Sequence, residues 1–216
     1  MAPANSSRFL HCDEPLPYRA GTSPFHIKGE FCRQMGEAIS YHQAKSAGAL
    51  SRVLQREGLS EFATQPFLSS ALYDVLPLPR IVMAIAEASG RDVRALTGRM
   101  GQAAVDGQMK GVYSRILGSM TPENFCSRFV QVIQHFYDFG PVTTAGTGSG
   151  AQVGRSGVPL CIAEWWSLVT APFVVVPLTV NGARDVSVDW RVEPRGTDRG
   201  VAVGNVTWAV RWSIQP

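Results

Sequence analysis

The sequence predicts an α+β fold, in which a helical N-terminal part packs on a small antiparallel sheet with an inserted helix. Two observations carry this prediction. Apolar residues recur at helical spacing from residue 27 to residue 139, and strict alternation replaces that spacing in two stretches beyond residue 142. All the tryptophans lie in this second part: Trp165, Trp166, Trp190, Trp208 and Trp212.

The length of 216 residues suits a single domain. We expect residues 1–26 to form an extended or mobile leader, because prolines and small polar residues offer no periodic apolar face there. The domain then spans residues 27–216, with a helical part over 27–139 and a sheet-containing part over 140–216.

The composition argues against several classes of protein. The formal net charge of +3 is small and the basic residues are scattered, so no nucleic-acid partner is expected. The four cysteines are widely separated and lack the spacing of zinc or redox sites, so neither a metal nor a disulfide is expected. Because no apolar run of signal-peptide length stands near the start, we expect a cytoplasmic protein.

The first helices follow from apolar spacing and from residues that end a helix. One helix begins near Lys28, and a second runs from about Ser46 to Glu57 before Gly58. A third begins at Pro79, since proline suits a first helical turn. The first two helices are expected to form a dimer surface, so self-association is predicted.

The longest predicted helix runs from Asp92 to about Leu117, and another begins at Thr121, where Thr-Pro-Glu is a typical helix start. The long helix carries small residues on its inner stripe, including Gly107 and Gly111. A glycine inside a helix usually indicates close approach by another group. Tight packing of a neighbouring helix and room for a ligand beside the sheet are both open interpretations.

In the second part, residues 142–153 read as a strand diluted by glycines, and residues 160–180 form an apolar stretch. The apolar stretch is long enough to span a bilayer. Pro172 and Pro177 and the need to cover the sheet favour a buried, broken or kinked helix instead, so no membrane insertion is expected.

The last two strands alternate cleanly. Val186, Val188, Trp190 and Val192 share one face of the first strand. In the second strand, Val201 and Val203 have the opposite parity to the later apolar residues, which predicts a β-bulge near Gly204-Asn205. Trp208 and Trp212 share the inward face, where they form either plain core or the frame of an apolar cavity.

Several short motifs resemble a family of uncharacterised single-domain proteins that is expanded in myxobacteria. They are Ile27-Lys28-Gly29, Arg56-Glu57-Gly58-Leu59, Leu76-Pro77-Leu78-Pro79, the Gly101, Gly107 and Gly111 pattern, Gly182-Ala183-Arg184-Asp185-Val186-Ser187-Val188, and Trp212. That family is similar in topology to the vinyl-4-reductase domain, the haem-based nitric-oxide-binding domain and the Bet-type tethering subunits. The resemblance implies a sensing or assembly module with a hydrophobic ligand between helices and sheet.

Motifs for chemistry are weak. Tyr113-Ser114-Arg115 has the residues of a haem-propionate signature without its spacing, and His42 on an apolar stripe reads as a core histidine. The glycine run 146–150 lacks the context of a phosphate loop or a nucleophile elbow and reads as a hairpin connection. No enzyme activity and no cofactor are therefore predicted.

The sequence as a whole predicts a non-catalytic module that binds a hydrophobic small molecule or a partner protein. The expected ligand-binding residues are Gly107, Gly111, Trp165, Trp190, Trp208 and Trp212. A haem- or metal-bearing sensor is the first alternative, and a structural adaptor with a filled core is the second.

Overall fold

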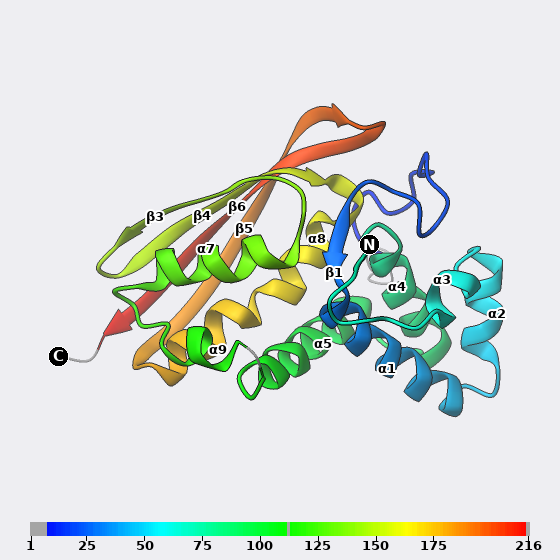
Figure 1. The fold of residues 1–216 in the computed structure, drawn as a ribbon, viewed down its shortest axis with the longest axis horizontal. Coiled ribbons are helices and arrows are strands. Elements are labelled where there is room, and N and C mark those ends of the chain that lie inside the picture. The colour runs from blue at the N-terminus through cyan, green and yellow to red at the C-terminus, as the bar shows by residue number, and fades with distance from the viewer. Residues whose placement is uncertain (1–7, 112, 215–216) are drawn as a thin grey trace, which may run out of the picture.

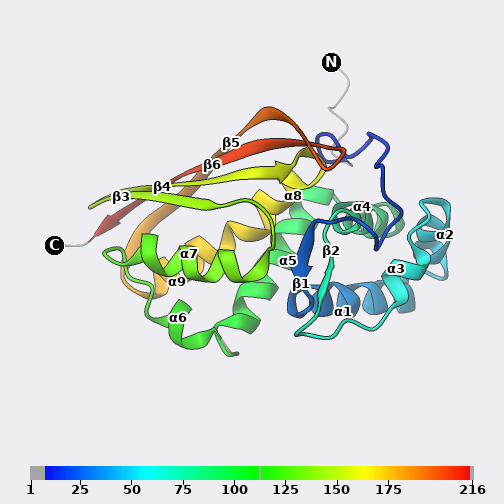
Figure 2. The same ribbon diagram turned by 45° about the horizontal axis from the view of Figure 1, so that its top comes forward.

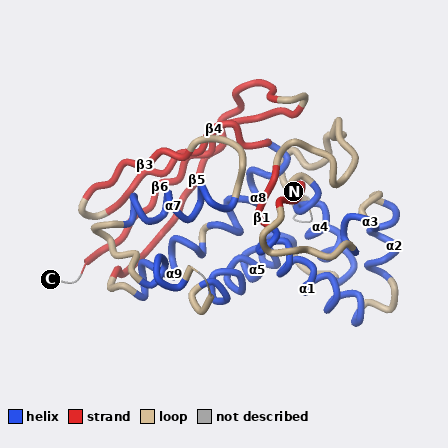
Figure 3. The backbone as a smooth tube through the Cα atoms, in the orientation of Figure 1, coloured by secondary structure: helices blue, strands red, loops and turns tan. Residues whose placement is uncertain are grey.

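The computed structural model of the chain describes residues 8–111 and 113–214. Figure 1 shows a four-stranded sheet covered on one face by helices, with a larger group of helices beside it. In Figure 3 the strands of the main sheet lie together with the helices Phe125–Phe136 and Pro172–Val180 beside them, while the four helices within residues 29–89 lie at the opposite end of the molecule. The predicted α+β architecture is confirmed.

The helical part comprises seven helices and one small sheet within the described residues. The helices are α1 (Gly29–Lys45), α2 (Ala49–Arg56), α3 (Ser60–Thr64), α4 (Pro77–Ser89), α5 (Val93–Gln108), α6 (Ser114–Gly118) and α7 (Phe125–Phe136). Strands β1 (His26–Lys28) and β2 (Leu72–Asp74) pair antiparallel beside α1, and this pair was not anticipated from the sequence. Strands of three residues are too short to show periodicity.

Two predicted helix boundaries were wrong by several residues, and α4 begins at Pro77, two residues before its predicted start. Helix α5 ends at Gln108, and a turn separates it from α6, so Gly111 lies outside the helix rather than on its stripe. Helix α7 begins at Phe125, because Thr121 and Asn124 form a local turn in which the Asn124 amide oxygen accepts from the Thr121 N–H. Such local side-chain bonds compete with helix formation.

The main sheet has the strand order β3-β4-β6-β5 and is antiparallel throughout. Its strands are β3 (Val142–Thr147), β4 (Gly150–Pro159), β5 (Ala183–Asp198) and β6 (Val201–Ile214). The segment expected as one strand over residues 142–153 is a hairpin, and the glycine run makes its turn. Helices α8 (Leu160–Thr170) and α9 (Pro172–Val180) are inserted between β4 and β5.

The backbone conformation at the boundary between the two parts requires a glycine. Gly140 has φ +65°, and a β-carbon there would lie 1.9 Å from the carbonyl oxygen of Ser156. Only glycine fits such a left-handed position against another strand. The change of character seen at this residue in the sequence is therefore a true corner of the fold.

One face of the sheet carries the core, while the other has no helix over it in the described part of the chain (Figure 2). Trp166 of α8 stacks on Trp208 of β6 with ring centroids 4.9 Å apart, and Phe125 of α7 meets Trp212 at 5.8 Å. Trp208 and Trp212 are buried, as their parity predicts. Trp190 shares that face but is 36% exposed, because β5 is an edge strand.

The irregularity expected near Gly204-Asn205 is present, but the extra residues lie on the neighbouring strands. Strand β4 has one additional residue between Arg155 and Val158, and β5 has one between Pro194 and Gly196. Bulges increase local twist. The twist lets β6 bury Val201 and Val203 at its start, and the apolar residues of the opposite parity further along the strand.

The apolar stretch at residues 160–180 is mostly enclosed by the protein. It is long and apolar enough to cross a bilayer, yet 67% of its most apolar window is buried inside the fold. It is divided into α8 and α9 at Pro172, although Ala171 between them keeps helical dihedral angles. The predicted break at the prolines is therefore a local interruption in a nearly continuous helix.

The described part of the leader, residues 8–25, has no helix or strand and packs on the domain. Phe9 and Phe25 are buried, and the Tyr18 hydroxyl donates to the carbonyl of Arg199 in the turn between β5 and β6. The carboxylate of Asp74 accepts from the Gly21 and Ser23 N–H groups. This segment therefore contributes to the core through its buried aromatic side chains.

Candidate ligand cavity

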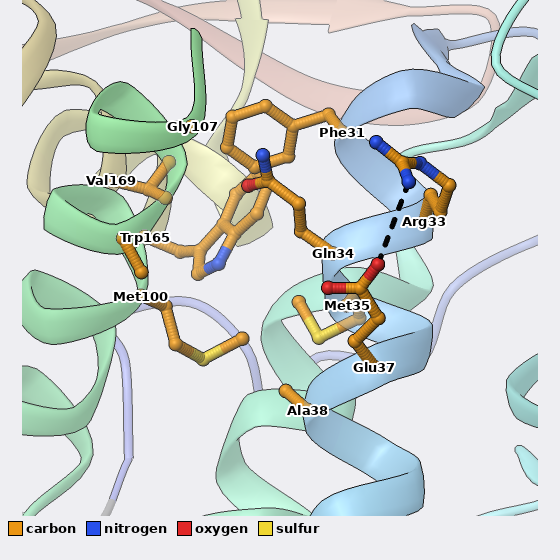
Figure 4. Close-up of a pocket in the computed structure, with 11 residues that line it drawn as sticks. Phe31, Arg33, Gln34, Met35, Glu37, Ala38, Met100, Gly107, Trp165 and Val169 are labelled. Atoms are coloured by element: carbon orange, nitrogen blue, oxygen red, sulfur yellow. Dashed lines mark ion pairs between the residues drawn. The ribbon is translucent and has the colours of Figure 1, made fainter. Parts of the chain in front are cut away.

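A cavity of about 480 Å³ lies between helices α1, α5 and α8 (Figure 4). This volume falls in the range of small-molecule sites. The cavity is lined by Phe31, Arg33, Gln34, Met35, Glu37 and Ala38 of α1, Met100, Ala103 and Gly107 of α5, and Trp165 and Val169 of α8. Its walls are therefore largely apolar, and two of them carry methionine thioethers.

Helical spacing places these side chains on facing surfaces. Phe31, Met35 and Ala38 follow one another at intervals of four and three residues along α1, and Met100, Ala103 and Gly107 do so at intervals of three and four along α5. Trp165 and Val169 are one turn apart on α8. Alanine and glycine at three of the lining positions leave space that larger side chains would fill.

Two of the helices that line the cavity are in close contact. A β-carbon at Gly101 would lie 2.6 Å from the Val169 carbonyl oxygen, so α5 and α8 touch through backbone atoms there. Gly101 is buried, whereas Gly107 two turns later is exposed and meets only the amide of Gln34. The glycine that permits close helix packing is thus Gly101, and Gly107 borders the cavity.

The charged groups at the mouth of the cavity neutralise each other. Arg33 and Glu37 form an exposed ion pair one turn apart on α1, with nitrogen and oxygen 3.6 Å apart (Figure 4). Gln34 is half-buried and points into the cavity, and its amide has no hydrogen-bond partner among the described residues. Nearby, the Gln108 amide donates to Glu30 over 3.0 Å, while its buried Oε1 has no donor within the described chain.

The indole N–H groups of the tryptophans differ in their partners. Trp208 donates to the Ser167 hydroxyl and Trp212 to the Gly148 carbonyl. Trp165 is 1% exposed, and its Nε1 has no acceptor in the part of the chain that is described. Figure 4 shows that nitrogen on the cavity side of the ring, facing the space between Met100 and Gln34.

Of the six residues predicted to bind a ligand, two line the cavity. These are Gly107 and Trp165, whereas Gly111 lies in the turn after α5. Trp208 and Trp212 fill the interface between helices and sheet, and Trp190 lies at the sheet edge. The cavity therefore lies between helices and not at the sheet. The α1 wall was missed because its apolar stripe has the same spacing as ordinary core.

A further buried group lies in the packed interface. Arg155 of β4 is 2% exposed and donates to the carbonyls of Phe139 and Ile133. Its guanidinium lies 4.9 Å from the Tyr137 ring centroid and 5.7 Å from that of Trp166. Burial lowers the pKa of Arg155 to about 10. Carbonyl dipoles and ring faces solvate this cation, and no carboxylate of the described residues forms an ion pair with it.

Comparisons with known proteins place the fold. No family model matches the sequence, and no curated protein matches it. Solved structures do match. An oxygen-binding H-NOX domain related to soluble guanylate cyclases, in its oxygen complex, has a TM-score of 0.55 at 9% identity, covering 87% of this chain and 95% of its own.

Two further solved structures agree. An H-NOX protein from K. algicida, with unliganded Fe(II), gives a TM-score of 0.57 at 9% identity over 87% of this chain and 97% of its own. A T. Tengcongensis H-NOX mutant gives 0.54 at 11% identity, over 87% and 98%. The chain has an H-NOX fold. At these identities the match establishes architecture alone, and the nitric-oxide-binding topology expected from the sequence is confirmed.

The H-NOX fold raises the question of haem, and the residues of this cavity do not fit a histidine-ligated one. Of the four histidines, all in described regions, none lines the cavity. His26 pairs with Asp138 at the surface, and His42 lies at the far end of α1, where burial and nearby Arg91 lower its pKa. An imidazole is the usual proximal ligand in haem sensors. No reaction step is therefore assigned to a haem here.

The lining also lacks groups for covalent chemistry. Among the described residues, no thiol, hydroxyl or imidazole borders the cavity. The described chain likewise holds no cluster of three or more His, Cys, Asp or Glu side chains that could bind a metal. What the cavity offers a small molecule is apolar surface, an amide and an indole N–H.

Proposed function

We propose that this H-NOX-fold domain is a non-catalytic sensor or carrier that binds a hydrophobic small molecule in the cavity between α1, α5 and α8. The single observation that supports this most strongly is an apolar cavity of about 480 Å³ lined by two methionines and a buried tryptophan. The cavity opens to solvent beside the exposed residues Arg33, Glu37 and Gly107, so a small molecule can enter it.

Binding in this cavity has a direct test. Ala38 lines the cavity, and Ala44 is exposed further along the same helix. We expect Ala38→Phe to reduce the binding of Nile red, an uncharged apolar dye, at least tenfold, because the new ring occupies the space. Ala44→Phe should bind as the unmodified protein does. Mass spectrometry of compounds released on denaturation then identifies a natural ligand. Equal dye binding by both variants would refute the proposal.

The fold favours a second candidate, a haem-bearing sensor, because H-NOX structures are the neighbours. Met35 and Met100 are the lining residues with soft sulfur ligands, and Glu37 adds a carboxylate at the rim. Reconstitution with haemin followed by absorbance in the Soret region separates the two candidates. A stoichiometric Soret band that Ala38→Phe abolishes would support the haem sensor over our first proposal.

Self-association and a cytoplasmic location stay predictions from the sequence. Helices α1 and α2 are the proposed dimer surface, where Tyr41 is 51% exposed at the end of α1. Sedimentation velocity with Tyr41→Glu is the corresponding measurement, since a charge at a dimer contact shifts the equilibrium toward monomer.

A further inference from the structure

The polar groups of the cavity define the class of ligand, on the assumption that the proposed binding function holds. We propose that the ligand is an uncharged, apolar molecule with one hydrogen-bond-accepting oxygen, such as a ketone, which accepts from the indole N–H of Trp165. The Gln34 amide is the second polar contact. The ligand's body then lies between the thioethers of Met35 and Met100.

Among the residues that the structure describes, the indole N–H of Trp165 is an unsatisfied donor in the cavity wall. Trp165 is 1% exposed, and its Nε1 faces the cavity without an acceptor in the described chain (Figure 4). Buried indole N–H groups usually have partners, and those of Trp208 and Trp212 do. Trp166 Nε1 also lacks one, but that ring stacks on Trp208 in the packed core and does not line the cavity. Trp165 is thus the donor that a ligand can reach.

Among the described residues, the cavity lining has no charge free to pair with a ligand. The lining has one acid and one base, Glu37 and Arg33, and they pair with each other at the exposed mouth. No described lining residue offers an unpaired charge to a ligand. An ionised ligand would lose its hydration on entering the cavity and gain no counterion there. The free-energy cost of this desolvation is larger for an ion than for a neutral carbonyl compound. The cavity therefore selects neutral molecules.

The Gln34 amide forms the polar end of the cavity. Gln34 is half-buried, lacks a partner among the described residues, and lies against Gly107. Its amide can donate to the same oxygen as Trp165 or accept from a hydroxyl on the ligand. The Trp165 N–H can only donate, whereas the Gln34 amide can donate or accept. An acceptor oxygen on the ligand is therefore favoured, because both residues can then donate to it.

The test uses three planar naphthalenes of matched shape, carrying an isopropenyl, an acetyl or a carboxylate group at the same ring position. Titration calorimetry with the full chain should show the acetyl compound binding roughly threefold to tenfold tighter than the isopropenyl one, as a single hydrogen bond provides. The carboxylate should bind most weakly. Trp165→Phe should remove the acetyl preference while isopropenylnaphthalene still binds.

Two controls keep the outcomes distinct. Trp190→Phe makes the same change at the exposed sheet edge, and Gln131→Leu matches Gln34→Leu at an exposed position on α7. Both should keep the acetyl preference, whereas Gln34→Leu should reduce it even if Trp165→Phe fails to fold. Binding of none of the compounds would overturn the proposed function itself. Equal binding of the three, tightest binding of the carboxylate, or a preference that survives both Trp165→Phe and Gln34→Leu would overturn only the ligand class.

Discussion

Gly101 of α5 lies against the backbone of Val169 in α8, where a β-carbon would come within 2.6 Å of the carbonyl oxygen. This contact joins the helical part to the helix inserted in the sheet. Gly98, one turn earlier on α5, has nothing within 4 Å of the same hypothetical atom. The two glycines provide a matched pair for measuring what close approach requires.

We expect Gly101→Ala to lower the free energy of unfolding by about 1–3 kcal/mol, because α5 and α8 must separate to admit the methyl group. Gly98→Ala should raise it by up to about 1 kcal/mol through helix propensity alone. Urea unfolding followed by circular dichroism measures both. Equal effects of the two substitutions would show that the helices do not meet at Gly101.

Arg155 should not tolerate a change to lysine. An ammonium group cannot donate to both the Phe139 and Ile133 carbonyls while stacking on Tyr137. Arg155→Lys is therefore expected to cost about 2 kcal/mol or more of stability. Arg211→Lys, at an exposed ion pair with Asp189, should cost less than about 0.5 kcal/mol in the same thermal-unfolding measurement. Comparable losses would contradict the buried cation.

Stability should fall above about pH 9. Burial raises the pKa of Cys32 and Cys161 to about 12, and it also raises the pKa of Cys12 and Tyr137. A group whose folded pKa lies above its unfolded value stabilises the protein fully below the unfolded pKa, and this stability is lost as the pH rises toward the folded one. Arg155, with its lowered pKa, opposes the trend only above about pH 10.

The contribution of a single thiol to this loss can be isolated. Between about pH 8 and about pH 10.5, Cys32→Ala should lose about 2 kcal/mol less stability than the unmodified protein, because one buried thiol no longer resists ionisation. Urea unfolding at the two pH values gives the difference. An identical pH dependence for variant and parent would exclude Cys32 as a contributor.

The leader should detach when Asp74 is lost. This buried carboxylate accepts from the N–H groups of Gly21, Ser23 and Leu76 and from the Ser23 hydroxyl. We expect Asp74→Ala to cost about 3 kcal/mol and to expose residues 8–25 to rapid proteolysis. Asp189→Ala on the sheet edge is the control. Unchanged cleavage of the leader in Asp74→Ala would show that other contacts suffice to hold it.

The order of elements was predictable from the sequence because periodicity is local. Spacing identified α1, α4 and the β5–β6 hairpin, and the prolines located the division between α8 and α9. Boundaries were wrong where a local turn competes with a helix, as at Asn124 and after Gln108. The inward parity of Trp208 and Trp212 also followed from alternation, since side chains point to opposite faces along a strand.

The location of the candidate site was decided by tertiary structure. Phe31, Met100 and Trp165 lie more than sixty residues apart in the chain on three different helices, and each lies on a stripe with the spacing of ordinary core. The spacing of apolar residues shows which side of a helix is apolar. It does not show whether neighbouring helices pack tightly against that side or leave a space beside it. The small side chains of Ala38, Ala103 and Gly107 leave the cavity open, and only the packed fold reveals that the Trp165 N–H has no partner among the described residues.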